Sequence, residues 1–391
     1  MSLMTNLTTL RETTVTNLQN KGITEASNSM GLTTLANKIT SISTGETYTI
    51  STITPFTTTG FIDEQIPITI TAVDSKNKPA AVKIYLKIDN IVQEETVQTL
   101  KNGRVVLNFS SNVVGEHTIQ AFINETSVSS PITITLSNPN YYVNPAGNDS
   151  NAGTSSTAPF KTLNKAISTA TDKSSIYVQA GYYAGTSNTV LTISKNLTIY
   201  GDGSAVFSGE NSRQSGFTVN TGYAVTCNGL KFINGGGDAG AVTVNDNCSI
   251  INCNFTNNEK STSTDDATGW GGAVYCIGSN NYIFNSDFYS NKAYLGGAIC
   301  NNSSKNTVTD CTFSGNNASN DGGAIYNNSS NNTVTDCAFS GNTASNYGGS
   351  IYIYDNNDNV KNCSFKNNTP TNLYVQGTYS GTITNCYWGT D

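Results

Sequence analysis

Apolar and polar positions repeat along the second half of the chain with a period of 26 residues. The segment NTVTDCTFSGNNASNDGGAIYNNSSN, residues 306–331, is followed directly by NTVTDCAFSGNTASNYGGSIYIYDNN, so that Cys311 corresponds to Cys337 and Phe313 to Phe339. Upstream, the glycine pair and the phenylalanine position recur at spacings of 23 to 33 residues. Such a period is typical of a solenoid protein, in which each repeat forms one structural unit.

These repeats predict a parallel β-helix rather than a stack of helices. Glycine pairs, asparagine clusters and β-branched residues do not favour helix pairs, whereas equivalent strand residues stack about 4.8 Å apart, the interstrand spacing. A corner at Thr309–Asp310 would turn Val308, Cys311 and Phe313 inward and create ladders of like side chains. We expect a mainly β protein with about nine coils over residues 139–391, capped at their start by a short amphipathic helix.

Two other regions precede the repeats. Residues 46–138 contain short alternating segments such as IPITITAV and VKIYLKID, separated by turn signals, and about seven such strands predict an immunoglobulin-like β-sandwich. In residues 1–45, leucine and isoleucine at helical spacing predict two short helices. Such short helices cannot bury their narrow apolar stripe alone. We expect this segment either to serve attachment and oligomerisation or to form a hairpin packed on the next domain.

Composition and charge exclude several classes of function. Only 12% of the 391 residues are charged, the net charge is −7 and no run of Lys or Arg is present, so nucleic-acid binding lacks its main electrostatic term. The chain has no stretch of about 18 apolar residues, and we expect no membrane span. The N-terminus lacks the apolar region of a secretory signal. Either the start was trimmed, or the protein leaves the cell within an assembly such as a virus particle.

Cysteine and histidine usage favours a structural interpretation. The nine cysteines are an odd number without any Cys-x-x-Cys pair, and His117 is the single histidine, so zinc-site spacing is absent. Cysteines stacked about 4.8 Å apart exceed the Cβ separation that a disulfide prefers. We therefore expect mostly free, buried thiols, and a structural role for His117.

Several segments resemble known families. YYVNPAGNDSNAGTSSTAPFKTLNKAI, residues 141–167, is similar to the starting and capping segment of pectate-lyase-like β-helix domains, which implies a right-handed, single-stranded solenoid. The motifs GGAIY and FSGN resemble the polymorphic outer-membrane-protein repeat, and NCYWG, residues 385–389, resembles coil endings in adhesin-like surface proteins of methanogenic archaea. Those surface proteins also carry immunoglobulin-like modules. Residues 7–39 resemble helical segments in structural proteins of tailed viruses and proviruses, whose fibres are commonly trimers.

Catalysis has little support in the sequence. The lyases of this fold that the chain resembles use Asp-bound calcium beside a basic residue, and glycosidases need two carboxylates about 5 to 10 Å apart. The predicted β-helix has one arginine, Arg213, and no histidine. Its one acidic doublet, Asp265–Asp266, lies in the loop at 257–269, which lengthens one coil to 33 residues. With Glu259 these groups would bind calcium or form an acid pair, unless the loop is merely solvated. We expect neither enzymatic activity nor any other cofactor.

Outward-facing aromatic residues favour glycan binding. In the GGAIY motif the isoleucine points inward, so the next residue points outward, and that column holds Tyr275, Cys300, Tyr326 and Tyr352. A second column, just before the glycine pairs, places two more rings roughly 14 Å apart. Stacked aromatic rings beside asparagine-rich ladders suit sugar rings, unless the tyrosines only sheathe the coils. The candidate ligand-binding residues are Trp270, Tyr275, Tyr294, Tyr326, Tyr347, Tyr352, Asp265 and Asp266.

The combined expectation is a virion-associated, tail-fibre-like adhesin that binds a host cell-surface glycan. Residues 1–45 would contact other virion proteins, with a homotrimer as the expected assembly, while the sandwich spaces and the β-helix carries the site. The alternatives are a tailspike-like polysaccharide depolymerase with carboxylates near Asp265, a host-anchored cell-surface adhesin, and a purely structural spacer. The expected location is the virion surface or the cell exterior.

Overall fold

The computed structural model describes residues 48–100, 103–123, 126–127, 129–210, 216–237, 240–260, 269–355 and 357–389, together with Val15. The chain forms two compact units. The first comprises Met1–Thr58, Ile68–Leu107 and Glu116–Ile134, and the second comprises Thr59–Pro67, Asn108–Gly115 and Thr135–Asp391. The helical segment predicted for residues 1–45 lies outside the described residues, apart from Val15. None of the helices in the described residues has the length and apolar character that a bilayer crossing requires.

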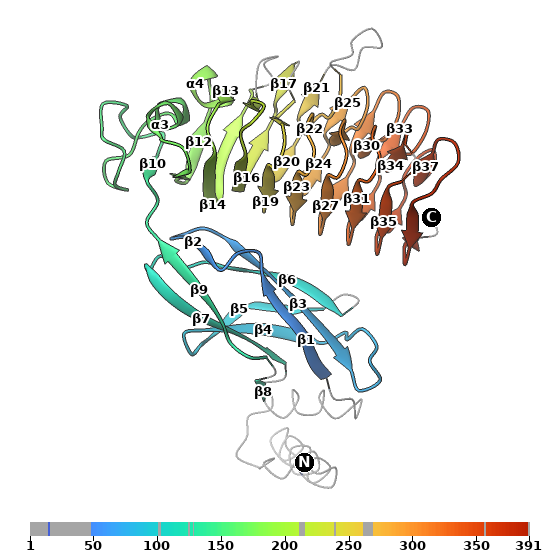
Figure 1. The fold of residues 1–391 in the computed structure, drawn as a ribbon, viewed down its shortest axis with the longest axis horizontal. Helices are drawn as coiled ribbons and strands as arrows, with labels where there is room; N and C mark the ends of the chain where they lie inside the picture. The colour runs from blue at the N-terminus through green and yellow to red at the C-terminus, as the bar shows by residue number, and fades with distance from the viewer. Residues whose placement is uncertain are drawn as a thin grey trace, which may run out of the picture. The chain divides into compact units, whose positions relative to one another are not determined.

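Residues 48–137 form two β-sheets, built from strands with alternating burial (Figure 1). In β3, Ile66, Ile68 and Ile70 are fully buried, whereas Thr69 and Thr71 between and beyond them are partly exposed. The first sheet has the order β1 (Tyr48–Pro55), β3 (Ile66–Asp74) and β6 (Arg104–Phe109). The second has the order β2 (Thr59–Phe61), β9 (Ile132–Ser137), β7 (Gly115–Ile123), β4 (Lys83–Ile88) and β5 (Ile91–Thr99), with β8 (Thr126–Ser127) paired to β7.

The single histidine lies in β7 of this region. His117 is buried, and its Nδ1 atom lies 2.6 Å from the carboxylate of Asp89. A second oxygen of Asp89 accepts a hydrogen bond from the backbone N–H of Thr118. These contacts hold a turn against a strand, which agrees with the structural role predicted for His117.

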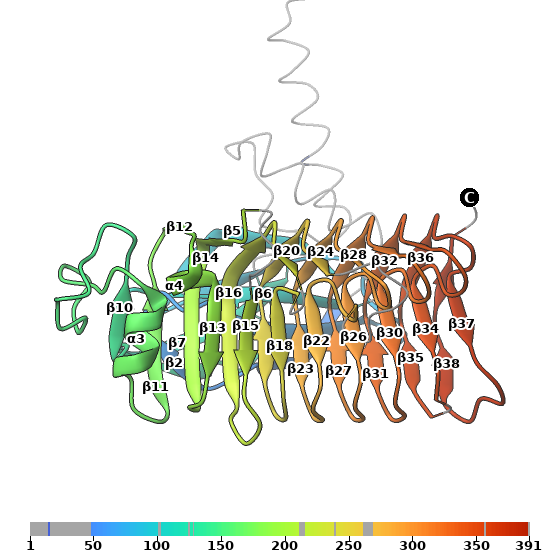
Figure 2. The ribbon, with the colours of Figure 1, turned by 90° about the horizontal axis from the view of Figure 1, so that it is seen from above.

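Residues 141–389 form a parallel β-solenoid, whose strands follow one another in rows (Figures 1 and 2). One row stacks eight strands, so the solenoid has about eight turns. This sheet contains β13 (Val190–Ile193), β15 (Gly216–Val219), β18 (Val242–Val244), β22 (Val274–Cys276), β26 (Ile299–Asn301), β30 (Ile325–Asn327), β34 (Ile351–Ile353) and β37 (Leu373–Val375). Successive strands pair in parallel and in register, so equivalent repeat residues become neighbours.

Two further sheets run along the solenoid, one of 17 strands and one of five, so the shorter sheet is present in only some of the coils. The shorter one contains β17 (Gly236–Gly237), β21 (Glu259–Lys260), β25 (Lys292–Ala293), β29 (Asn317–Ala318) and β33 (Thr343–Ala344). The large one contains β10 (Tyr141–Val143), β11 (Ser174–Val178), β12 (Gly181–Tyr183), β14 (Leu197–Ser208), β16 (Val225–Ile233), β19 (Ser249–Ile251), β20 (Asn254–Thr256), β23 (Tyr282–Phe284), β24 (Asp287–Tyr289), β27 (Thr307–Thr309), β28 (Thr312–Ser314), β31 (Thr333–Thr335), β32 (Ala338–Ser340), β35 (Asn359–Lys361), β36 (Ser364–Lys366), β38 (Thr382–Thr384) and β39 (Tyr387–Trp388).

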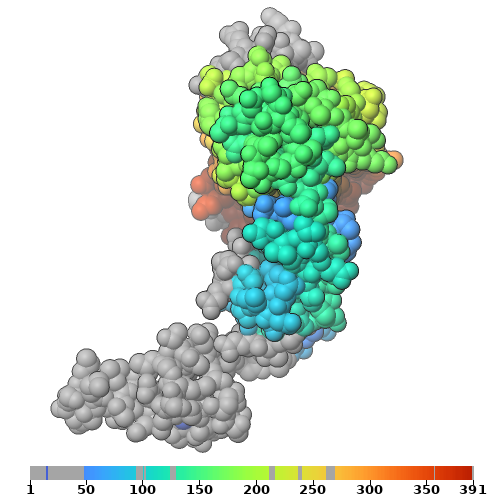
Figure 3. Space-filling view, turned by 90° about the vertical axis from the view of Figure 1, so that its left-hand side faces the viewer, coloured from blue at the N-terminus to red at the C-terminus, as the bar shows by residue number. Residues whose placement is uncertain are grey.

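A short helix lies at the start of the solenoid, as the sequence predicts. In α3 (Leu163–Thr169), the Thr162 hydroxyl caps the first turn by accepting the N–H of Lys165. Leu163 and Ala166 are fully buried in the solenoid core. A second, one-turn helix, α4 (Thr186–Thr189), follows. Figure 3 looks onto this end, which the atoms coloured green cover. The helices thus shield the first open edge of the stacked strands.

Left-handed backbone at the coil corners explains the polar residues of the repeat. Asp310, Asp336 and Asn362 occupy equivalent corners with φ of 56°, 54° and 54°. Asn and Asp tolerate this conformation better than most residues, because their short polar side chains bond locally. The hydroxyl of Thr309 donates to the carboxylate of Asp310 at such a corner. The predicted corner at Thr309–Asp310 is confirmed.

The interior consists of ladders of like side chains. Adjacent rings along the phenylalanine ladder lie 4.6 to 5.6 Å apart, a range that suits offset stacking. Its members are Phe207, Phe232, Phe255, Phe288, Phe313, Phe339, Phe365 and Trp388. All nine cysteines are free, and eight of them are buried, which confirms the prediction of free thiols. Burial raises the pKa of Cys253 to about 12, so this thiol keeps its proton and is a poor nucleophile.

Buried asparagine ladders, which the sequence patterns did not predict, also join the coils. The side-chain oxygen of Asn316 accepts both the backbone N–H and the side-chain N–H of Asn291. Its own amide donates to the carbonyl of Phe288 and to the side-chain oxygen of Asn342. Asn258, two coils before Asn316, and Asn342, one coil after it, make the same kinds of contact. Each coil is therefore hydrogen-bonded to the next at a corner as well as along the strands.

Candidate functional site

The outward column of the eight-stranded sheet is less exposed than the sequence predicts. Register places Tyr275, Cys300, Tyr326, Tyr352 and Tyr374 in one column along the solenoid. Yet Tyr326 is only 7% exposed, Tyr352 is 5% exposed, and Cys300 is fully buried. Alternation correctly gives the direction of these side chains, but the expectation that this column is exposed is wrong for Tyr326, Tyr352 and Cys300.

A turn that precedes each glycine pair covers this column. The turn residues form a second column in the order Trp270, Leu295, Asp321 and Tyr347, linked by parallel backbone pairing. The ring of Trp270 meets Tyr275 edge-on at 5.8 Å. At the other end, Tyr347 stacks on Tyr374 at 4.4 Å. The second column therefore packs against the first on the outside of the coil.

Together these side chains form a small apolar cluster outside the main core. We use the name outer aromatic cluster for Trp270, Tyr275, Tyr294, Leu295, Cys300, Tyr326, Tyr347, Tyr352 and Tyr374. The sequence predicts every member of this cluster, in a column or as a ligand-binding residue, except Leu295 and Tyr374. These two residues lie in the same columns as the predicted ones. The cluster thus brings together six of the eight predicted ligand-binding residues.

The glycine pairs allow the turn to fold over the strand. Gly296 adopts φ of 61°, in the left-handed region. Gly297 lies so close to the next coil that an added Cβ would be 2.3 Å from the carbonyl oxygen of Gly323. One glycine thus supplies the backbone bend and the other supplies the close approach. The glycine pair of the GGAIY motif therefore builds the outer aromatic cluster.

The cluster presents rings to solvent mainly at its two ends. Tyr347 is 50% exposed, and the nearby Tyr354 is 49% exposed. Trp270, Tyr294 and Tyr374 are half-buried. Since equivalent coils are about 4.8 Å apart, Trp270 and Tyr347 lie roughly 14 Å apart along the axis. The surface therefore offers a row of partly exposed rings parallel to the solenoid axis.

A buried lysine supports one end of this row. Lys260 is 2% exposed; its Nζ atom donates to the carbonyl oxygen of Trp270 at 3.0 Å and lies 4.4 Å from the centre of the Tyr275 ring. A desolvated cation over a ring is attracted to it by about 2 kcal/mol. No pattern in the sequence predicts this role, because Lys260 lies in a polar stretch ten residues before Trp270. Lys260 fixes the position of Trp270.

Polar groups lie beside the rings. The hydroxyl oxygen of Tyr294 accepts a hydrogen bond of 2.8 Å from the side-chain amide N–H of Asn320. The side-chain oxygen of Asn320 accepts a hydrogen bond from the side-chain amide N–H of Asn346. The carboxylate of Asp321 accepts the backbone N–H of Tyr347 at 3.1 Å. Burial raises the pKa of Asp321 above its usual value. The site thus combines aromatic faces with amide and carboxylate groups.

The acidic doublet is not placed by the structure. Asp265 and Asp266 lie outside the described residues, so the calcium or acid-pair role suggested for them stays a prediction. In the described part of the chain, no group of three or more His, Cys, Asp or Glu residues could hold a metal ion.

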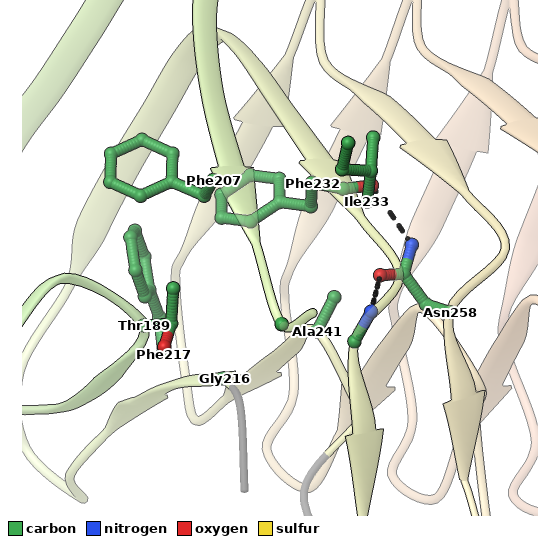
Figure 4. Close-up of a pocket in the computed structure, with 10 residues that line it drawn as sticks. Thr189, Phe207, Gly216, Phe217, Phe232, Ile233, Ala241 and Asn258 are labelled. Atoms are coloured by element: carbon green, nitrogen blue, oxygen red, sulfur yellow. Dashed lines mark hydrogen bonds between the residues drawn. The ribbon is translucent and has the colours of Figure 1, made fainter. Parts of the chain in front are cut away.

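A small cavity lies elsewhere in the solenoid core (Figure 4). Its volume is about 10 Å³, close to the room that one water molecule needs. It is lined by Phe207, Phe217 and Phe232 among others, and no lining residue is titratable. Asn258 at its edge already bonds the carbonyl of Phe232 and the N–H of Gly235. This pocket therefore lacks the titratable groups that acid–base chemistry needs.

Comparisons with known proteins give one family match and one similar solved structure. A family model described as "Protein of unknown function (DUF1565)" matches residues 145–388. No curated protein matches the chain. A solved structure, "Rhamnogalacturonan lyase", shares 15% sequence identity with a TM-score of 0.29, over 63% of this chain. The match spans 62% of that protein's length. At this identity and score, the lyase's activity does not transfer to this chain.

Proposed function

The chain belongs to the DUF1565 family through its β-solenoid, and on that premise we propose that this solenoid binds glycan chains at the outer aromatic cluster. The observation that carries the proposal is the partly exposed row from Trp270 to Tyr347, with amide groups beside it. Sugar rings have apolar faces and hydroxyl edges, so they pack on aromatic faces and bond to neighbouring polar groups.

Two features favour binding over mere sheathing of the coils. Tyr326 and Tyr352 already cover the outer face of the coils, and both are buried beneath the turn column. Tyr347 and Tyr354 add rings that stay about half exposed, although aromatic residues are usually buried further. Exposed rings on a rigid, hydrogen-bonded scaffold lose little conformational entropy when a ligand binds, because the site is preorganised.

We further propose that the protein acts as an adhesin at a virion surface or a cell surface. This proposal rests on the resemblance of the repeats to adhesin-like proteins and of residues 7–39 to viral structural segments. The solenoid would contact the glycan, and residues 1–45 would attach to other virion proteins. Immunogold labelling of virions and of cells with an antibody to the solenoid distinguishes the two locations.

The test of glycan binding uses the full chain and a panel of immobilised polysaccharides. Tyr347→Ala removes an exposed ring of the row, and Tyr387→Ala removes a ring that is 69% exposed outside the cluster. We expect retention on one or more polysaccharides, about tenfold weaker in Tyr347→Ala and unchanged in Tyr387→Ala. Glycan chain length is followed in the same samples. Shortened chains, or equal retention of both variants and the wild type, would contradict binding without cleavage at this site.

A further inference from the structure

We infer that the outer aromatic cluster selects uncharged glycan chains and holds them parallel to the solenoid axis, across several coils. This inference rests on the proposed function, because it names the ligand class of the same site. Two independent observations carry it: the near absence of charge along the cluster, and the direction in which its rings repeat.

The charge pattern of the site disfavours acidic sugars. The five segments that build the cluster, residues 269–275, 294–300, 320–326, 346–352 and 372–376, contain one charged residue, the acid Asp321. A uronate, sulfate or phosphate group on the ligand would find no cation in these segments to offset its desolvation.

The nearest buried cation is already engaged. Lys260 donates to the carbonyl oxygen of Trp270 and lies against the Tyr275 ring, and it is 2% exposed. An acidic ligand group would have to compete with both of these contacts to pair with the ammonium group. Lys260 therefore supports the cluster from beneath and does not serve as an anion anchor.

Asp321 occupies the middle of the row and favours neutral sugars. Its column has the order Trp270, Leu295, Asp321, Tyr347, so the carboxylate lies between the two ring-bearing ends. Asp321 is partly exposed, and one of its oxygens accepts the N–H of Tyr347. A carboxylate accepts hydrogen bonds from sugar hydroxyls strongly, and it repels a ligand carboxylate at the same place.

The direction of the ligand follows from the register of the strands. Parallel pairing places equivalent residues one coil apart, so Tyr326, Tyr352 and Tyr374 stack in sequence at 5.0 and 5.4 Å. The amide column of Asn320 and Asn346 runs in the same direction. A glycan along the axis would therefore meet the partly exposed rings at both ends of the cluster, with Asp321 between them and the amide column beside them. A chain lying across the axis would leave the rings after one coil.

The experiment measures affinity of the full chain for defined oligosaccharides by titration calorimetry. The probes are length series of unbranched neutral glucans, mannans and N-acetylglucosamine oligomers, and matched series of polygalacturonate and alginate oligomers. We expect the tightest neutral series to bind at least about tenfold more tightly than either acidic series. Its affinity should rise with length until the oligomer covers roughly 14 Å and then level off.

Two variants sharpen the test. Asp321→Asn keeps the shape of the side chain but removes its charge, and we expect it to narrow the neutral-over-acidic preference by about threefold or more. Asp310→Asn changes a corner acid of the large sheet, outside the cluster, and is the matched control because Asn362 already occupies the equivalent corner. It should leave the preference unchanged.

The outcomes separate this inference from the proposed function. Tighter binding of an acidic series, or affinity independent of length, overturns the inference even if Tyr347→Ala weakens binding. Absence of binding to every series, or binding that Tyr347→Ala leaves unchanged, contradicts the proposed function itself. If Asp321→Asn and Asp310→Asn changed the ratio of neutral to acidic affinity equally, Asp321 would not set the selectivity.

Discussion

Removal of one buried asparagine should destabilise the solenoid far more than removal of its exposed neighbour. Asn316→Ala deletes four hydrogen bonds: two from Asn291, one to Phe288 and one to Asn342, with lengths of 2.9 to 3.0 Å. Each such bond contributes about 1 kcal/mol net, so the expected loss is about 4 kcal/mol. Because Asn316 is fully buried, water compensates little for the lost partners.

The assay is urea unfolding followed by circular dichroism, with free energies from linear extrapolation. Asn317→Ala is the matched control, because Asn317 is exposed and adjacent in the same coil. We expect the control to change the free energy of unfolding by no more than about 0.5 kcal/mol. If Asn316→Ala lowered the free energy of unfolding no more than the control does, the asparagine ladder would not hold the coils together. The site would then lack the rigid scaffold on which the binding proposal relies.

Three further predictions concern the thiols, a buried acid and the lysine beneath the site. In the folded protein, a thiol reagent should label at most Cys386, the one partly exposed cysteine, and should label all nine after unfolding. Burial raises the pKa of Asp358 to about 7, above its unfolded value of about 3.9. The protonated Asp358 therefore stabilises the fold fully below its unfolded pKa, and this stabilisation is lost as the pH rises through about 7. Above about pH 7, Asp358→Asn should raise the free energy of unfolding measured in urea, and that free energy should depend less on pH than in the wild type. Lys260→Met removes the bond to the carbonyl of Trp270, and should weaken glycan binding about threefold to tenfold while circular dichroism stays unchanged; unaltered affinity would show that Lys260 does not position that ring.

The repeat alone predicts the main axis of the fold and the inner ladders. A fixed spacing between Cys311 and Cys337, with β-branched residues between turn residues, leaves few architectures other than stacked coils. The corner at Asp310 follows because Val308 and Cys311 cannot share a face of one straight strand. These conclusions need only period and alternation, which are properties of the sequence itself.

Burial on the outside of the coil could not be predicted in the same way. Alternation tells that Tyr326 points outward, but not that the turn column will pack over it, because this depends on the path of the backbone through the glycine pair. The asparagine ladder was missed for a related reason. Asn316 and Asn317 are identical neighbours in the sequence, and only the left-handed bend at Gly315 decides which one points inward.

The placement of Trp270 in the site also needs the structure. Its supporting residue, Lys260, is ten positions away in the chain and meets it only because the coil returns at that point. Long-range contacts of this kind leave no local pattern in composition or spacing. Six of the eight predicted residues lie in one cluster, whereas Lys260, which bonds the backbone of Trp270, could not be predicted from the sequence.

The most direct test of glycan binding at the outer aromatic cluster is the fluorescence of Trp270 during a glycan titration. The chain has two tryptophans, and Trp388→Phe leaves Trp270 as the single reporter, while a phenyl ring can still stack on Phe365. We predict that the polysaccharide retained best shifts the Trp270 emission to shorter wavelength and protects it from acrylamide quenching, with one saturation curve for both signals. Saturable binding that leaves the emission and quenching of Trp270 unchanged would place the glycan elsewhere on the protein and contradict the account.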